Sequence, residues 1–227
     1  MRRSPLSAWM LLLVTACEAP GPSPSIYGSM REVLREGRDH GRVELTSVTS
    51  PDSVGVGALA GLAGEVTIVD GRAMVSRLQG ERLRVREARR GEQAALLVTA
   101  QVPEWRAWPL LDVQDYAGLE AQVRDRLIEA GFDPCEPTPL RVTGRAERLQ
   151  LHVIAGACPV ATPDGSEPWR YDGPAEAVTL VGFYVEDAVG RLTHHTHSSH
   201  LHAHAAAATG HLDDVALCDA RLFLPAR

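Results

Sequence analysis

The sequence predicts an α+β fold that is predominantly β, with mixed or antiparallel sheets and two helices. Stretches rich in β-branched and alternating apolar residues recur along the chain, whereas apolar residues follow helical spacing in only two segments. Glycine-containing turns such as Asp70-Gly71 and Gln79-Gly80 separate neighbouring strands and indicate antiparallel hairpins. A chain of 227 residues suits one such domain.

The two helices are predicted over 30–36 and 115–131. Ser29 and Glu32 have the spacing of a capping box, and Gly37 stands where a left-handed residue ends a helix. The second helix shows a periodic apolar face that we expect to pack on a sheet. This face consists of Tyr116, Leu119, Val123 and Leu127.

The strands are predicted from alternating or β-branched runs between these helices and after them. They cover 42–48, 65–69, 73–78, 94–101, 140–143, 149–154, 178–185 and 215–224. A further strand is expected at the histidine-rich segment described below.

The first residues are typical of an exported bacterial lipoprotein. Arg2 and Arg3 precede the apolar run 9–14, and Val14-Thr15-Ala16-Cys17 resembles a lipobox, in which Cys17 would carry the lipid. We therefore expect a signal peptide over 1–17, a proline-rich tether over 18–25 and one folded domain over 26–227. The protein would be anchored to the membrane in the periplasm or at the cell surface. The alternative is a plain signal peptide with a chance cysteine.

Composition excludes several classes of function. All 23 basic residues are arginine, so mechanisms that need a lysine amine, such as Schiff-base decarboxylation, are excluded. Any reaction through a carbanion would then need another electron sink, and a metal ion is the natural substitute for the lysine Schiff base. The net charge is -6 with acidic and basic residues interleaved, which argues against nucleic acid as a partner.

Three cysteines remain once Cys17 is set aside. Cys135 and Cys158 flank the hairpin predicted from strands 140–143 and 149–154, so a disulfide between them is plausible in an oxidising compartment. Cys218 would then be left over, and the sequence does not decide the pairing.

Seven of the nine histidines fall between 194 and 211. In a strand, His200 and His202 project to one face, and a turn over 206–210 would bring His211 back beside His202. Three neutral imidazoles with an open fourth position are the arrangement of a catalytic zinc, although other divalent transition metals also fit. His195 is a candidate additional ligand.

Two other readings of the histidines stay open. A histidine-rich tract can be a low-affinity metal buffer without chemistry. Individual histidines can also be ordinary surface residues, an interpretation that suits His194, His197 and His204.

Four segments, taken in order, resemble the α-acetolactate decarboxylases. They are Val54-Gly55-Val56-Gly57-Ala58-Leu59, Leu62-Ala63-Gly64-Glu65 through Asp70-Gly71, Thr179-Leu180-Val181-Gly182-Phe183-Tyr184, and His200-Leu201-His202 with Gly210-His211-Leu212-Asp213. The resemblance implies a β-barrel or sandwich that binds zinc through His200, His202 and His211. It also implies decarboxylation of 2-acetolactate, or a similar 2-hydroxy-3-keto acid, to acetoin.

The resemblance also suggests catalytic residues. Glu65 matches an active-site glutamate of the family, which would protonate the intermediate left by carbon dioxide; its alternative is a solvent-facing residue that begins a strand. His152 falls where the family has a substrate-binding arginine, and it is equally well read as a core strand residue. A protonated histidine can hold a carboxylate but lacks the bidentate fork of arginine. The family's second glutamate, near the C-terminus, has no obvious equivalent here.

Three functions therefore compete. The first is a zinc-dependent lyase, and the second is a non-catalytic lipoprotein that binds or buffers zinc. The third is metal-assisted hydrolysis with Glu65 or His195 as the base. The expected partners are a small-molecule substrate and, through Cys17, the membrane, and a homodimer is left open.

Overall fold

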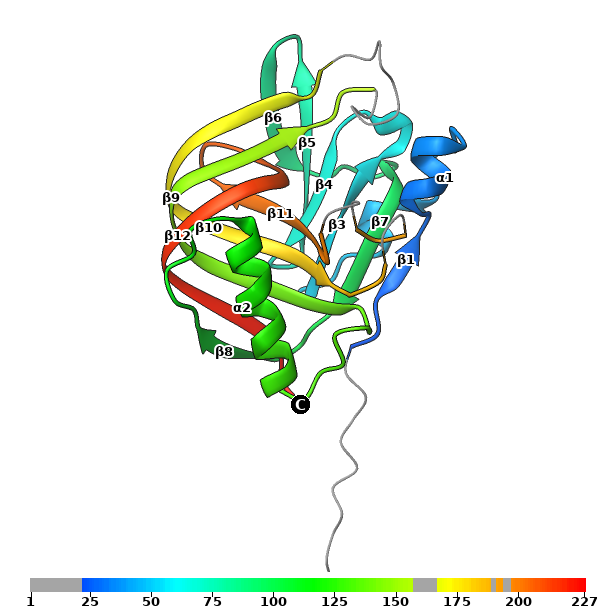
Figure 1. The fold of residues 1–227 in the computed structure, drawn as a ribbon. Coiled ribbons are helices and arrows are strands. Elements are labelled where there is room, and N and C mark those ends of the chain that lie inside the picture. The colour runs from blue at the N-terminus through cyan, green and yellow to red at the C-terminus, as the bar shows by residue number, and fades with distance from the viewer. Residues whose placement is uncertain (1–21, 157–166, 189–190, 194–196) are drawn as a thin grey trace, which may run out of the picture.

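The computed structural model describes residues 22–156, 167–188, 191–193 and 197–227. Two antiparallel β-sheets pack face to face, and α2 covers the outer face of the second sheet (Figure 1). This confirms the predicted fold class, and the architecture is a sandwich instead of a closed barrel. Within the described ranges, no helix is long and apolar enough to cross a membrane.

The first sheet has the strand order β1-β7-β3-β4-β5-β6, and β2 also pairs with β7. Its strands are β1 (Ser25–Tyr27), β2 (Val43–Glu44), β3 (Ser53–Leu59), β4 (Glu65–Val69), β5 (Arg72–Gln79), β6 (Arg82–Glu87) and β7 (Gln93–Gln101). Two short 3-10 helices, η1 (Leu45–Ser47) and η2 (Ala60–Leu62), and the helix α1 (Met30–Arg35) belong to the same half of the chain.

The second sheet has the order β11-β10-β9-β12-β8, and β11 also pairs with the start of β12. Its strands are β8 (Trp105–Pro109), β9 (Thr138–Val153), β10 (Trp169–Tyr184), β11 (Ser199–Ala205) and β12 (Thr209–Pro225), and helix α2 is Tyr116–Glu129. The predicted apolar face of α2 is buried in the largest core cluster, together with side chains of β9, β10 and β12.

Both helices lie where the sequence predicts them. Ser29 caps α1 by accepting a hydrogen bond from the backbone N–H of Glu32 at 3.2 Å, as the capping box requires. Asp115 caps α2 in the same way, accepting from the N–H of Gly118 at 2.8 Å.

Several strand predictions are wrong in extent. The predicted strand 42–48 ends after β2, because the Ser47 hydroxyl donates to the carbonyl of Glu44 at 2.7 Å and closes a turn. Strands β1, β3, β6 and β8 were not expected. In β3 the glycines lower strand propensity, yet Gly57 is needed because a Cβ there would collide with the backbone of Leu96.

The predicted hairpin between Cys135 and Cys158 is also wrong. Strand β9 runs without a break from Thr138 to Val153, although Gly144 suggests a turn. Gly144 instead allows a close approach, since a Cβ there would lie 3.2 Å from the Cα of Ala220 in β12. Cys158 lies outside the described residues, so the disulfide itself stays a prediction.

Candidate metal centre and active site

Three histidines meet where β11 turns back into β12. His202 lies directly opposite His211 in the antiparallel register, and His200 is two residues before His202 on the same face. One ligand atom from each of the three lies within 4.8 Å of the others. The ring centroids are 5.0 Å apart for His200 and His211 and 5.5 Å apart for His202 and His211. These three residues could hold one metal ion.

The donor set fits zinc or a similar transition metal. His202 is fully buried, and its Nδ1 lies 2.9 Å from the hydroxyl of Thr67 on β4, in the opposite sheet. A hydrogen bond at one ring nitrogen fixes the ring and leaves Nε2 for a metal, as metal-binding histidines usually show. The sequence does not single out Thr67, although its position two residues after Glu65 places both side chains on one face of β4.

Glu65 opens β4 and is only 4% exposed, so its alternative as a solvent-facing residue is wrong. Its Oε2 lies 3.8 Å from Nε2 of His202, and its Oε1 accepts a 3.4 Å hydrogen bond from the N–H of Ile154. Burial raises the pKa of Glu65 to about 7, and His152 and the Ile154 N–H offset part of this effect. The carboxyl group is therefore held in a dry place beside the histidines.

His152, near the end of β9, lies directly opposite His211. Its Nδ1 is 2.6 Å from Oδ1 of Asp213, and Oδ2 of Asp213 is 2.8 Å from Nη1 of Arg170 on β10. Asp213 belongs to the irregularity between Leu212 and Asp214, where the β9–β12 register shifts. Asp213 and Arg170 are not predicted from the sequence as partners of His152. The two-residue spacing of Asp213 from His211 was the signal in the sequence that could have placed Asp213 on the histidine face of the strand.

A pocket of about 50 Å³ lies in front of these groups. Glu65, His152, His200 and His211 all line it, and they come from β4, β9, β11 and β12. The remaining lining is apolar and comes mainly from α1, η2, β3 and β7. Acidic, imidazole and apolar groups thus converge on one small space.

The other histidines of the cluster have different contacts. Nδ1 of His197 lies 3.3 Å from Glu120 of α2, and its ring lies 4.3 Å from that of Tyr116. Nδ1 of His204 lies 2.8 Å from the hydroxyl of Thr209, and burial lowers the His204 pKa. His194 and His195 lie outside the described residues, so the role predicted for His195 has no geometry here.

Similarity to known proteins is visible in structure and not in sequence. No family model and no curated protein matches the chain. Among solved structures, α-acetolactate decarboxylase from Bacillus subtilis strain 168 superposes with a TM-score of 0.72 at 17% identity, covering 90% of this chain and 86% of that one. The fold is that of an acetolactate decarboxylase.

Two further structures agree with this assignment of the acetolactate decarboxylase fold. A Staphylococcus aureus protein of unknown function, described as similar to α-acetolactate decarboxylase, has a TM-score of 0.72 at 16% identity and covers 88% of this chain and 84% of its own. Acetolactate decarboxylase from Bacillus subtilis subspecies spizizenii has a TM-score of 0.66 at 16% identity, with coverage of 90% and 86%. At these identities the comparison establishes the fold.

Proposed function

We propose that this protein is a metal-dependent carboxy-lyase that converts 2-acetolactate, or a similar 2-hydroxy-3-keto acid, to acetoin or its homologue. The observation that carries the proposal is that Glu65, His152, His200 and His211 line one and the same pocket. The acetolactate decarboxylase fold supports the same reaction class.

The chain's own residues can be given distinct tasks in this reaction. A zinc ion held by His200, His202 and His211 would supply a Lewis acid for the substrate's hydroxyl and ketone oxygens. Nδ1–H of His152 donates to the Asp213 carboxylate, and when the imidazole is protonated its Nε2–H is a second donor that can hold the substrate carboxylate. This assigns to His152 the anchoring role that an arginine has in the family.

Glu65 is the proposed proton donor. When the bond to the carboxylate carbon breaks, carbon dioxide leaves, and the electron pair stays on the carbon that carries the hydroxyl group. The Glu65 carboxyl gives its proton to that carbon and becomes a carboxylate. Water returns a proton to Glu65 before the next turnover. The apolar part of the pocket keeps other water away from the carbon until this transfer is complete.

The cellular site of this reaction is proposed from the sequence. Residues 1–17 and Cys17 lie outside the described residues, and the lipobox-like pattern supports an exported protein that is anchored by lipid at Cys17.

The decisive experiment measures acetoin released from racemic 2-acetolactate by the zinc-loaded protein. We expect turnover that a chelator abolishes and that Glu65→Gln lowers by about 10²–10⁴-fold, because the amide cannot donate the proton. Glu81→Gln, an exposed residue of the β5–β6 turn, is the matched control and should keep full activity. If the wild type binds zinc and acetolactate stays intact, the decarboxylase proposal is wrong.

Metal analysis separates this proposal from a zinc buffer. We expect one tightly held ion per chain, since His197 and His204 already contact Glu120 and Thr209. Several weakly held ions with no tight one would favour the buffering function.

A further inference from the structure

The pocket has two unlike walls. Glu65, His152, His200 and His211 form the polar wall. The apolar wall consists of Met30, Val33, Ala58, Leu62, Leu96 and Ile154. These six side chains belong to one buried cluster that is separate from the larger cores of the two sheets. A ligand whose polar head reaches the histidines must therefore place its aliphatic part against this cluster.

Helix α1 supplies two side chains of this wall, Met30 and Val33. Met30 is 5% exposed and Val33 is 3% exposed, although α1 has only six residues. The helix is short, and its buried face is turned toward the pocket and the neighbouring η2 and β7 side chains. These two residues can therefore change the size of the pocket without altering a strand.

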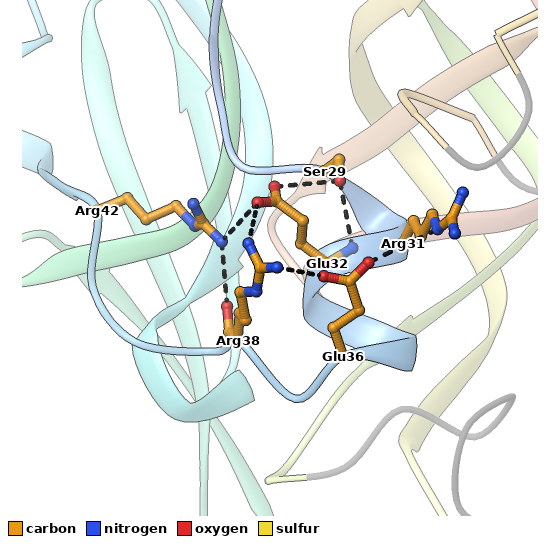
Figure 2. A network of polar contacts seen from close by, with 6 residues as sticks. All are labelled: Ser29, Arg31, Glu32, Glu36, Arg38 and Arg42. Atoms are coloured by element: carbon orange, nitrogen blue, oxygen red, sulfur yellow. Dashed lines mark hydrogen bonds and ion pairs between the residues drawn. The ribbon is translucent and has the colours of Figure 1, made fainter.

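A polar network holds α1 in this position (Figure 2). Oε1 of Glu32 lies 3.2 Å from Nη1 of Arg38 and 3.4 Å from Nη2 of Arg42, which precedes β2. Arg38 also reaches Glu36 at 2.8 Å, and the N–H of Met30 donates to the carbonyl of Arg191 at 3.4 Å. The network joins α1 to the chain before β2, so the apolar wall keeps a defined distance from the metal centre.

We propose that Met30 and Val33 select the substrate by the length of its aliphatic substituent. The inference rests on the proposed function, because it takes the polar wall as the place of the reacting head group. Contact with an aliphatic wall distinguishes ligands by single methylene groups, and such a difference typically changes affinity or rate by about 10–200-fold. In a pocket of about 50 Å³, the wall sets an upper limit to the chain, and shortening Met30 or Val33 raises that limit.

The test uses straight-chain alkyl hydroxamic acids, from acetohydroxamic to hexanohydroxamic acid. Their head group chelates zinc whether or not the protein decarboxylates anything. Calorimetry on the zinc-loaded wild type should show affinity falling by at least about tenfold at one chain length. In Met30→Ala and Val33→Ala this fall should move to a longer chain, with at least about tenfold tighter binding of the longer acids than in wild type.

Two variants serve as controls. Met30→Leu keeps the volume of the side chain and should restore the wild-type limit. Glu81→Gln changes an exposed residue of the β5–β6 turn and should leave the limit unchanged. Zinc content of one ion per chain verifies that each variant is folded around its metal centre.

Three results would overturn the inference. They are an unchanged chain-length limit in both alanine variants, an equal loss of affinity for all the hydroxamic acids in those variants, or no binding of any acid by the zinc-loaded wild type. The outcome is separable from that of the proposed function. A shifted limit without acetoin release from acetolactate would support the chain-length role of α1 and reject the decarboxylase. Acetoin release with an unshifted limit would support the decarboxylase and reject the chain-length role of α1.

Discussion

At the scale of single residues, the orientation of His202 depends on one hydroxyl group from the other sheet. Thr67 Oγ1 lies 2.9 Å from Nδ1 of His202, and both residues are fully buried. If the ring is held by this contact, Nε2 is directed toward a metal shared with His200 and His211. The hydroxyl therefore acts through the histidine and not on the metal itself.

Thr67→Val removes this hydroxyl and keeps the shape of the side chain. We expect zinc affinity to fall by about 10–100-fold, as is usual when the partner of a metal-binding histidine is lost. Competition with a chromophoric chelator measures the affinity, and Thr67→Ser, which keeps the hydroxyl, is the control. Equal affinity in wild type and Thr67→Val would show that Thr67 does not orient His202.

At the scale of elements, the β5–β6 hairpin is joined to the start of β7 through Glu92. Its two carboxylate oxygens accept hydrogen bonds from the Arg86 guanidinium group, both at 2.7 Å, and one also accepts from the N–H of Arg89. The Arg86 hydrogen bonds are the main cause that lowers the pKa of Glu92 to about 2. The folded structure therefore stabilises the ionised form of the Glu92 side chain relative to its protonated form.

Glu92→Gln should lower the free energy of unfolding by about 1–3 kcal/mol at pH 7. A carboxyl group with a lowered folded-state pKa stabilises the protein above its ordinary pKa of 4.5, and this contribution is lost as pH falls toward 2. The difference between wild type and variant in urea unfolding should thus be smaller at pH 3 than at pH 7. Glu81→Gln should show no such change, and a pH-independent difference for Glu92→Gln would contradict the prediction.

At the scale of the whole molecule, the candidate metal centre joins the two sheets. The three histidines lie on β11 and β12 of the second sheet, whereas Glu65 and Thr67 lie on β4 of the first. The three histidines come together when β11 and β12 pair, and packing of the sheets (Figure 1) then brings Glu65 and Thr67 against His202. A metal that binds this arrangement binds the folded state in preference to the unfolded one.

Zinc should therefore stabilise the protein against unfolding. At a free concentration 100 times the dissociation constant, the gain approaches about 2.7 kcal/mol if the unfolded chain does not bind the metal. Thermal unfolding with zinc and with excess chelator measures this difference. A variant with both His202→Ala and His211→Ala should show no shift, and an equal shift in that variant would place the stabilising metal elsewhere.

The sequence alone was sufficient where a local pattern sets the structure. The capping box at Ser29 predicted α1, helical periodicity predicted α2, and alternation predicted that His200 and His202 share a face. These features depend on hydrogen bonds and side-chain directions within a few residues, which the order of residue types largely determines.

Only the tertiary structure decided which distant groups meet. Thr67 reaches His202 across 135 positions of sequence, and Asp213 joins His152 to Arg170 at a register shift between β9 and β12. The apolar wall formed with Met30 was also not predictable from the sequence. The physical reason is that these contacts arise from sheet packing and strand register, which depend on the sum of many long-range contacts and not on any short run of residues.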